Sequence, residues 1–446
     1  MKKSKKIMAG LIGIFVLLLV LPFLIPTEKY LAEFEREVAA LLGVPVDIEN
    51  AHIYFIPSPR LSVEGIAIGQ SQDITVQSVT VIPSLWSLFS SSRTFALNVH
   101  QPVIKDTAMP FVSKLMASKS NTSTHSSIEI SQVDVDGLTL IWPSVKLPMF
   151  DLQVVFSKGM QLSTAEAKSE DGQLEMNIQP NEAGYSIVVN MDDWLIPLSH
   201  PWQVNQGRVD MALVNQTLDV SSMSLQMYGG TINGHAKLDW QKNWQLNGKI
   251  EIKDLSLAAP TKMMNPNTYL GGSLLSKGKF SANAKNADQL LNQLSADFVF
   301  TVNQGVLYGL DLVKVASLLV KQSAKGGQTQ FDTFTGELAV SGKRYHLKRM
   351  QVSSGLISAK GDVQINEQDK LDGAGEVEIK RSVGLVSVPL IVAGTLDKPL
   401  VYPSKAALAG AAVGTAILGP GLGTSLGSKA GSAVSGLKDL FGGGEK

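Results

Sequence analysis

Two neighbouring segments near the middle of the chain alternate apolar and polar residues without interruption, and this pattern limits the possible folds more than any other feature. The segments are 231–240 and 244–253. Successive side chains of a β-strand point to opposite faces, so each segment predicts a strand with one apolar and one polar face. Three polar residues, 241–243, join the strands at the length of a hairpin loop. The chain therefore contains a β-sheet with one apolar face.

Strand-like segments recur from residue 44 to residue 401, with stretches of helical periodicity only at 28–42, 286–294 and 310–322. We therefore predict a mainly β fold with a long antiparallel sheet and a few short helices. The residues predicted for the apolar face are Leu174, Met176, Ile178, Ile232, Ala236, Leu238, Trp240, Trp244, Leu246, Ile250, Ile252, Phe298, Phe300, Val302, Val377 and Ile379.

This apolar face must be buried against something, and the predicted helices are too few and too short to cover every strand. Two arrangements satisfy the requirement. Two sheets can pack face to face as a sandwich, or one sheet can curl so that its inner face meets lipid tails. The periodicity alone leaves both open.

The N-terminus predicts a membrane anchor. Residues 7–25 carry no polar side chain and span about 28 Å as a helix, close to the thickness of a bilayer core. Four lysines precede them, which predicts a cytoplasmic N-terminus and places the rest of the chain outside the inner membrane, that is, in the periplasm if the cell is Gram-negative. A cleaved signal peptide is the alternative, but the run is longer than usual and no clear cleavage site follows. The anchor residues are Ile7, Leu11, Ile14, Phe15, Leu18, Leu21, Leu24 and Ile25.

The last forty residues differ from the rest because they are rich in glycine and alanine. Their glycines recur at the spacing that allows helices to approach closely in membranes, at Gly410, Gly414, Gly423 and Gly427. Pro420 interrupts the segment, so each half is too short for an ordinary membrane span. A disordered tail and a membrane-contacting or self-associating hairpin both remain open. In the second case the tail is a candidate contact to the outer membrane.

The composition argues against most catalytic and nucleic-acid-binding functions. The formal net charge is +0, which offers no basic surplus for a phosphate backbone, and the chain has no cysteine for a disulfide or thiolate metal site. The six histidines are scattered without metal-binding spacing, and no nucleophile-elbow motif occurs. The acidic pairs at 170–171 and 192–193 are predicted in turns. We predict no enzymatic activity, no cofactor and no nucleic-acid partner.

Four stretches in the C-terminal half resemble the C-terminal domain of the AsmA family of Gram-negative envelope proteins. They are 303–312 at a strand-to-helix junction, 333–338, 359–365 and the closing segment 388–399, Val-Pro-Leu-Ile-Val-Ala-Gly-Thr-Leu-Asp-Lys-Pro, which is the most specific. Segments 42–46 and 59–69 resemble the family's opening, and the tail is similar to that of its shorter members. Residues 106–285 match only in strand pattern.

The resemblance implies a fold and a function. The family is similar to bridge-like lipid transfer proteins, whose long curled sheets form open apolar grooves that carry phospholipid between membranes. It is also linked to outer-membrane assembly and to protein targeting. The domain organisation expected from pattern and resemblance together is a transmembrane anchor at 1–27, an N-terminal helix and β segment at 28–105, a linker at 106–127, a repetitive β-groove at 128–286, an AsmA-like domain at 287–404 and a Gly/Ala-rich tail at 405–446.

Two functions follow as hypotheses. In the first, an inner-membrane-anchored periplasmic protein binds or conducts phospholipid toward the outer membrane through its apolar groove. In the second, the same chain is a periplasmic scaffold or assembly factor for outer-membrane proteins and uses its sheet edges for protein contacts without moving lipid.

Overall fold

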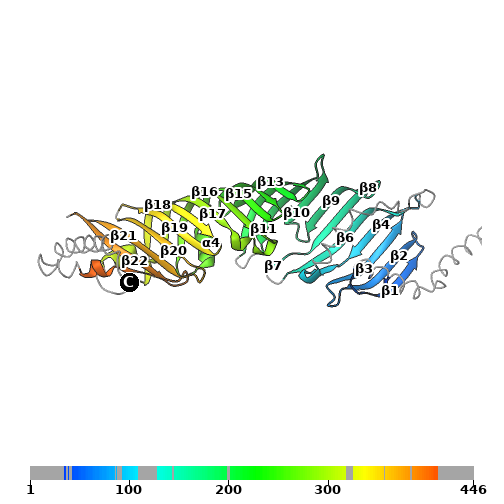
Figure 1. The fold of residues 1–446 in the computed structure, drawn as a ribbon, viewed down its shortest axis with the longest axis horizontal. Coiled ribbons are helices and arrows are strands. Elements are labelled where there is room, and N and C mark those ends of the chain that lie inside the picture. Colours follow the sequence, from blue (N-terminus) through cyan, green and yellow to red (C-terminus); the bar gives the residue numbers. More distant parts are fainter. Residues whose placement is uncertain are drawn as a thin grey trace, which may run out of the picture. The chain divides into compact units, whose positions relative to one another are not determined.

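The computed structural model describes residues 43–85, 93–108, 128–142, 145–197, 201–317, 325–355, 357–381 and 384–409, together with Glu35, Arg36, Ala39 and Ser87. This part of the chain is mainly β-strand with a few short helices, as the sequence predicts. It divides into two compact units, unit 1 (Met1–Pro201) and unit 2 (Trp202–Lys446). Figure 1 shows their strands in chain order. The division falls inside the predicted segment 128–286, and the sequence analysis did not anticipate it.

Unit 1 is an open sheet in which β1 forms one edge. Its strands are β1 (Val46–Tyr54), β2 (Arg60–Ile68), β3 (Ile74–Pro83), β4 (Arg93–His100), β5 (Val103–Lys105), β6 (Ile128–Trp142), β7 (Val145–Lys146), β8 (Phe150–Ser157), β9 (Gln161–Ser169), β10 (Leu174–Pro180) and β11 (Tyr185–Ile196). Neighbouring strands pair antiparallel in all cases but two: β4 and β5 each pair with β6 in parallel.

The parallel pairing explains the position of the predicted linker. Two parallel neighbours need a crossover connection of a dozen or more residues. Residues 106–127, which join β5 to β6, supply that length; they begin with the 3-10 turn η3 (Asp106–Ala108), and residues 109–127 lie outside the described part. The predicted linker thus connects two strands of one sheet.

An apolar row crosses the sheet of unit 1. Every strand except the short β5 and β7 contributes one apolar residue to the row. Each of these residues is the direct pairing partner of the next one on the neighbouring strand. In spatial order the row consists of Ala51, Val63, Val79, Val99, Val135, Leu152, Ala167, Met176 and Val189. The predicted residues Met176 and Ile178 lie on this face, and Leu174 shares it by its position in β10. The apolar faces of the individual strands therefore line up into one apolar face across the sheet of unit 1.

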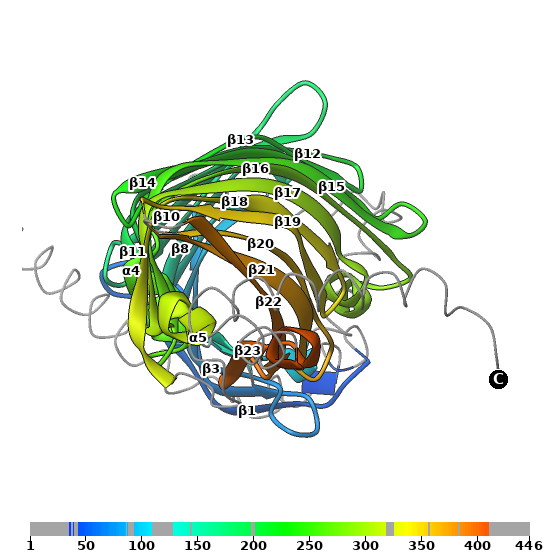
Figure 2. The same ribbon diagram turned by 90° about the vertical axis from the view of Figure 1, so that its left-hand side faces the viewer.

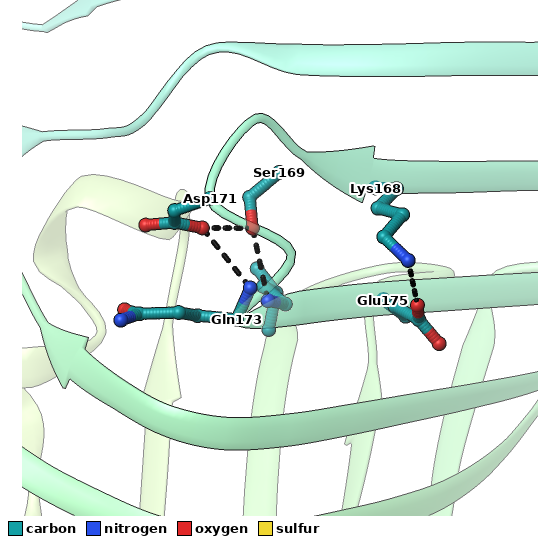
Figure 3. A network of polar contacts seen from close by, with 6 residues as sticks. Lys168, Ser169, Asp171, Gln173 and Glu175 are labelled. Atoms are coloured by element: carbon teal, nitrogen blue, oxygen red, sulfur yellow. Dashed lines mark hydrogen bonds and ion pairs between the residues drawn. The ribbon is translucent and has the colours of Figure 1, made fainter.

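A polar network fixes the turn between β9 and β10 (Figure 3). The buried Ser169 hydroxyl accepts a hydrogen bond from the Leu174 backbone N–H at 2.9 Å and contacts the Asp171 carboxylate at 2.5 Å. The hydrogen bonds from Ser169 and from the Gln173 backbone N–H hold the pKa of Asp171 below its usual value. Lys168 and Glu175 form an exposed ion pair beside the turn. Residues 170–171 thus occupy a turn as predicted, whereas Asp192 and Asp193 lie within β11, and that prediction was wrong.

Unit 2 is a curled sheet whose strands all pair antiparallel with their neighbours in sequence (Figure 2). Its strands are β12 (Trp202–Val214), β13 (Thr217–Met227), β14 (Gly230–Asp239), β15 (Trp244–Ser256), β16 (Tyr269–Ala284), β17 (Ser295–Leu310), β18 (Lys325–Ser341), β19 (Arg344–Ser353), β20 (Ile357–Ile365), β21 (Leu371–Arg381), β22 (Gly384–Gly394) and β23 (Pro399–Pro403). Each unit is thus an open sheet rather than two sheets packed face to face.

The predicted hairpin is confirmed by β14 and β15. Ile232 pairs with Ile252 and Leu238 with Leu246, so the apolar residues of the two strands share one face. Trp240 and Trp244 flank the turn and stack, with ring centroids 5.5 Å apart and an angle of 16° between the rings. The stack continues the apolar face to the end of the hairpin.

A line of β-bulges helps to curl the sheet of unit 2. Asp254 in β15, Gly272 in β16 and Gln304 in β17 have φ angles of +54°, +124° and +47°, and the pairing register shifts beside Asp254 and Gly272. A bulge bends its strand and increases the local twist. In a regular strand, residues three apart point to opposite faces. The extra residue of the bulge in β15 instead places Leu255 on the same apolar face as Ile252, where Leu255 pairs with Leu274.

The helices of unit 2 agree with the prediction only in part. The segment 286–294 forms two 3-10 turns, η4 (Ala287–Gln289) and η5 (Leu291–Gln293), instead of one helix. The segment 310–322 contains α5 (Leu312–Ser317), and its residues 318–322 lie outside the described part. Helix α4 (Ala258–Met264), which connects β15 to β16 and packs on β16, was not predicted.

Several predictions fall on residues outside the described part of the chain. These are the anchor at 7–25 and the tail glycines Gly410, Gly414, Gly423 and Gly427. In the predicted helix 28–42, Glu35, Arg36 and Ala39 are helical, and the Glu35 carboxylate accepts a hydrogen bond of 2.9 Å from the Ile48 backbone N–H of β1. No helix among the described residues has both the length and the apolar character needed to cross a membrane.

Candidate functional site

The inner face of unit 2 carries an apolar row that crosses the entire unit. One residue from each strand, from β12 to β23, is directly paired with the next, and every one is apolar or glycine. We call this set the central row; in spatial order it consists of Val209, Met223, Gly234, Ile250, Gly278, Phe298, Leu338, Leu347, Val363, Gly373, Val392 and Val401. The row is the floor of a candidate binding surface.

The central row lies on the concave side of the sheet. Helix α5 packs on β18, β21 and β23, and its Val315 is buried against Val377 and Val388 on the same face as the row. Figure 2 shows α5 inside the curl of unit 2. The charged residues of β14 and β15, such as Lys237 and Lys249, therefore point to the convex side.

Most of this apolar floor has no tight cover. The row residues from β12 to β19 are half-buried, as are Leu238, Leu246 and Ile252 beside the row. Within the central row only Val363 and Val401, at the C-terminal end, are buried, at 8% and 6% exposed. Side chains in a protein interior are close-packed on all sides. The central row from β12 to β19 is thus a line of apolar side chains that water reaches, although neighbours such as Leu255 and Val302 are buried.

Glycines and phenylalanines alternate across the floor in a recurring arrangement. The rings of Phe280, Phe298 and Phe300 lie over Gly248, Gly278 and Gly336, which are their direct partners on the neighbouring strands. A Cβ atom at any of these glycines would clash with the ring. Glycine in a strand often marks a place where another group approaches closely. Here the rings cover the glycine positions and fill the floor between the strands.

An apolar cavity of about 390 Å³ lies at the C-terminal end of the floor. We call it the terminal chamber. Its walls come from strands β16 to β23, from the β17–α5 junction and from the β22–β23 turn. Representative lining residues are Leu270, Leu312, Leu347, Val352, Leu390 and Leu396. The central-row residues Leu347, Val363, Val392 and Val401 also line it, so the chamber continues the floor.

A closed core forms the end wall of the chamber. It consists of Val315, Ile357, Val377, Ile379, Val388, Leu390, Val401 and Ala407, all 7% exposed or less. Two residues predicted for the apolar face, Val377 and Ile379, belong to this core. Val377 also lines the chamber, whereas Ile379 packs within the core and does not line it.

The other predicted residues of unit 2 lie together on the floor. Ile232, Ala236, Leu238, Leu246, Ile250 and Ile252 come from the central hairpin, with the Trp240–Trp244 stack at its turn. Phe298, Phe300 and Val302 follow on β17, where Val302 is 1% exposed. Apart from Val377, the chamber residues on β19 to β23 were not predicted, although Val388, Leu390 and Val392 show the same alternation.

Polar groups near the floor are already paired. On the convex side of the strands that line the chamber, Lys360 and Glu376 form an ion pair of 3.0 Å, and hydrogen bonding and attraction to Glu376 raise the pKa of Lys360. The Thr329 hydroxyl donates to the Leu310 carbonyl at 2.8 Å and accepts from the Leu312 N–H at 2.9 Å. Within the described ranges no cluster of three or more histidine or acidic side chains could hold a metal ion. The floor thus presents mainly apolar side chains, and no buried side-chain nitrogen or oxygen among the described residues lacks a hydrogen-bond partner.

Comparisons with known proteins add no relative to this description. No family model, curated protein or solved structure matches the chain.

Proposed function

We propose that this chain is an inner-membrane-anchored envelope protein that binds phospholipid acyl chains on the inner face of unit 2 and conducts lipid toward the outer membrane. The observation that carries the proposal is the half-buried central row from β12 to β19. A buried CH₂ group gains about 0.8 kcal/mol, so a continuous apolar floor holds an acyl chain without any specific polar partner. Lateral movement along such a floor exchanges one apolar contact for another.

The sequence supports the membrane setting of this proposal. The apolar segment 7–25 with its preceding lysines provides an anchor, and the stretches that resemble the AsmA family suggest lipid handling in a Gram-negative envelope. Unit 1 carries an apolar row of its own, so the same type of surface occurs separately in the N-terminal part of the chain. Support for outer-membrane assembly is the physiological role that fits this activity.

Mild purification followed by lipid analysis tests the proposal. We expect the full chain, extracted from membranes in a gentle detergent, to retain phospholipid that mass spectrometry detects in at least equimolar amount. A detergent-washed membrane protein with a single anchor and no apolar sheet serves as the control. The scaffold hypothesis expects outer-membrane protein clients and no more lipid than this control, and that result would contradict the proposal.

A further inference from the structure

The terminal chamber differs from the open floor because it is walled on several sides. The central row from β12 to β19 is half-buried, whereas α5 and the core around Val315 and Val388 close the end of the chamber. The β17–α5 junction, with Leu310 and Leu312, supplies a second wall. A ligand in the chamber would thus contact protein on more sides than a ligand on the central row. A volume of about 390 Å³ falls within the usual range for small-molecule sites.

The chemistry of the walls specifies the occupant. Thr329 is hydrogen-bonded to the backbone on both sides, and the paired side chains of Lys360 and Glu376 point to the opposite face of the sheet. No buried side-chain nitrogen or oxygen within the described residues is left without a hydrogen-bond partner. A polar ligand would lose hydrogen bonds to water and gain none from these side chains. A hydrocarbon chain loses no such bonds and gains contact with the apolar walls, so it fits.

The chamber has an opening at Leu396. Of the large apolar side chains that line the chamber, Leu396 in the β22–β23 turn is the exposed one, at 43%. The Asn265 side chain, at the end of α4, donates a hydrogen bond of 2.9 Å to the Leu396 carbonyl, which joins two segments 131 residues apart. Met264 beside it is 60% exposed. The exposed Asp397 and Lys398 follow Leu396. The opening thus combines an apolar passage with a charged rim in water.

We propose that the terminal chamber is a separate binding site for one hydrocarbon chain of a lipid, which enters past Leu396 while the polar headgroup stays at the rim. The inference depends on the proposed function, since it names a second lipid site beyond the open floor. It also gives the C-terminal end of unit 2 a distinct role, because one acyl chain at a time would be held there against the closed core that forms the end wall.

A polypeptide segment is the competing occupant. Residues 410–446 follow directly after helical residues 405–409, whose Ala407 is buried in the end wall. A peptide, however, brings backbone N–H and C=O groups that must be hydrogen-bonded when buried, and the chamber walls offer no such partners. Hydrocarbon is therefore the better match.

Photocrosslinking with peptide mapping tests this site. The probe is phosphatidylglycerol with a diazirine in one acyl chain, presented in vesicles to the full-length protein. We expect adducts in two separate places, on the floor strands β14 and β15 and on the chamber strands β19 to β22. Ala359→Phe fills the chamber and should lower the chamber adducts at least tenfold while the floor adducts stay unchanged. Val299→Phe, at a 45% exposed position on the convex face of β17, should change neither.

Leu396→Lys provides a second variant at an exposed position, where folding is not at risk, and should lower the chamber adducts at least fivefold. Floor adducts without chamber adducts would overturn the chamber site and leave the proposed function intact, whereas the absence of both would contradict both. Chamber adducts that neither Ala359→Phe nor Leu396→Lys reduces would also overturn the site. Uptake that begins only when residues 410–446 are removed would show that this segment is the occupant.

Discussion

Ile250→Glu is expected to lower the phospholipid retained by the full chain at least tenfold. Ile250 is half-buried at the middle of the central row, between Gly234 and Gly278. When an acyl chain binds, a carboxylate at this position must either lose its hydrating water or keep the floor around it hydrated. At the bilayer centre an acidic residue costs roughly 2.5–3.5 kcal/mol, and a tenfold loss of affinity requires only about 1.4 kcal/mol. Lipid retention measured by mass spectrometry gives the ratio.

The matched control introduces the same charge on the opposite face. Asn247 lies three residues earlier in β15, is exposed, and belongs to the polar face. Asn247→Glu should therefore leave the retained lipid unchanged. The Ile250→Glu protein should remain folded, because its carboxylate reaches water in the lipid-free state. Equal lipid retention in the two variants would exclude the floor as the binding surface.

Ile379→Glu is expected to destabilise the C-terminal end of unit 2 by more than about 4 kcal/mol, which is the cost of a buried, unpaired charge. Ile379 is 7% exposed in the core that forms the end wall, so its carboxylate cannot reach water. Two units in one chain make a single global unfolding curve hard to interpret. Amide hydrogen exchange in β20 to β22 reports the local stability instead, and should accelerate about a thousandfold.

Gln364→Glu on the exposed face of β20 is the control for this variant and should alter exchange little. The contrast between Ile250 and Ile379 is informative because both side chains are isoleucines on the same face of one sheet. An open floor tolerates a charge at the first position and a closed core does not tolerate it at the second. Unchanged exchange in Ile379→Glu would mean that the end wall is also open.

The alternation of side chains between the two faces of a β-strand explains why much of the fold could be predicted. The alternation in 231–240 and 244–253 is a local property of an extended backbone, so the shared apolar face of Ile232 and Ile252 followed from the sequence. A hairpin loop of three polar residues also fixed which strands were neighbours. The same reasoning, applied to β10 and β17, placed Met176 and Phe298 on the apolar faces of their units.

The remaining features depend on contacts that no local pattern encodes. The parallel pairing of β4 with β6 follows from how a long connection folds back. The bulges at Asp254 and Gln304 occur at residues that are not glycine, so nothing in the sequence marks their positive φ angles. Ile379 and Ile250 have equivalent patterns, but Ile379 lies in a core that includes Val315 of α5 and Ala407, and these long-range contacts are not encoded in the local pattern.

Cysteine accessibility tests most directly whether the central row is an open surface that lipid covers. The chain has no native cysteine, so single replacements Ile250→Cys and Asn247→Cys can be labelled with a water-soluble thiol reagent. We predict that both label rapidly in lipid-free protein, and that adding phospholipid protects the cysteine at 250 at least tenfold while leaving that at 247 unchanged. A cysteine at 250 that is inert without lipid, or that labels equally fast with it, would contradict the account.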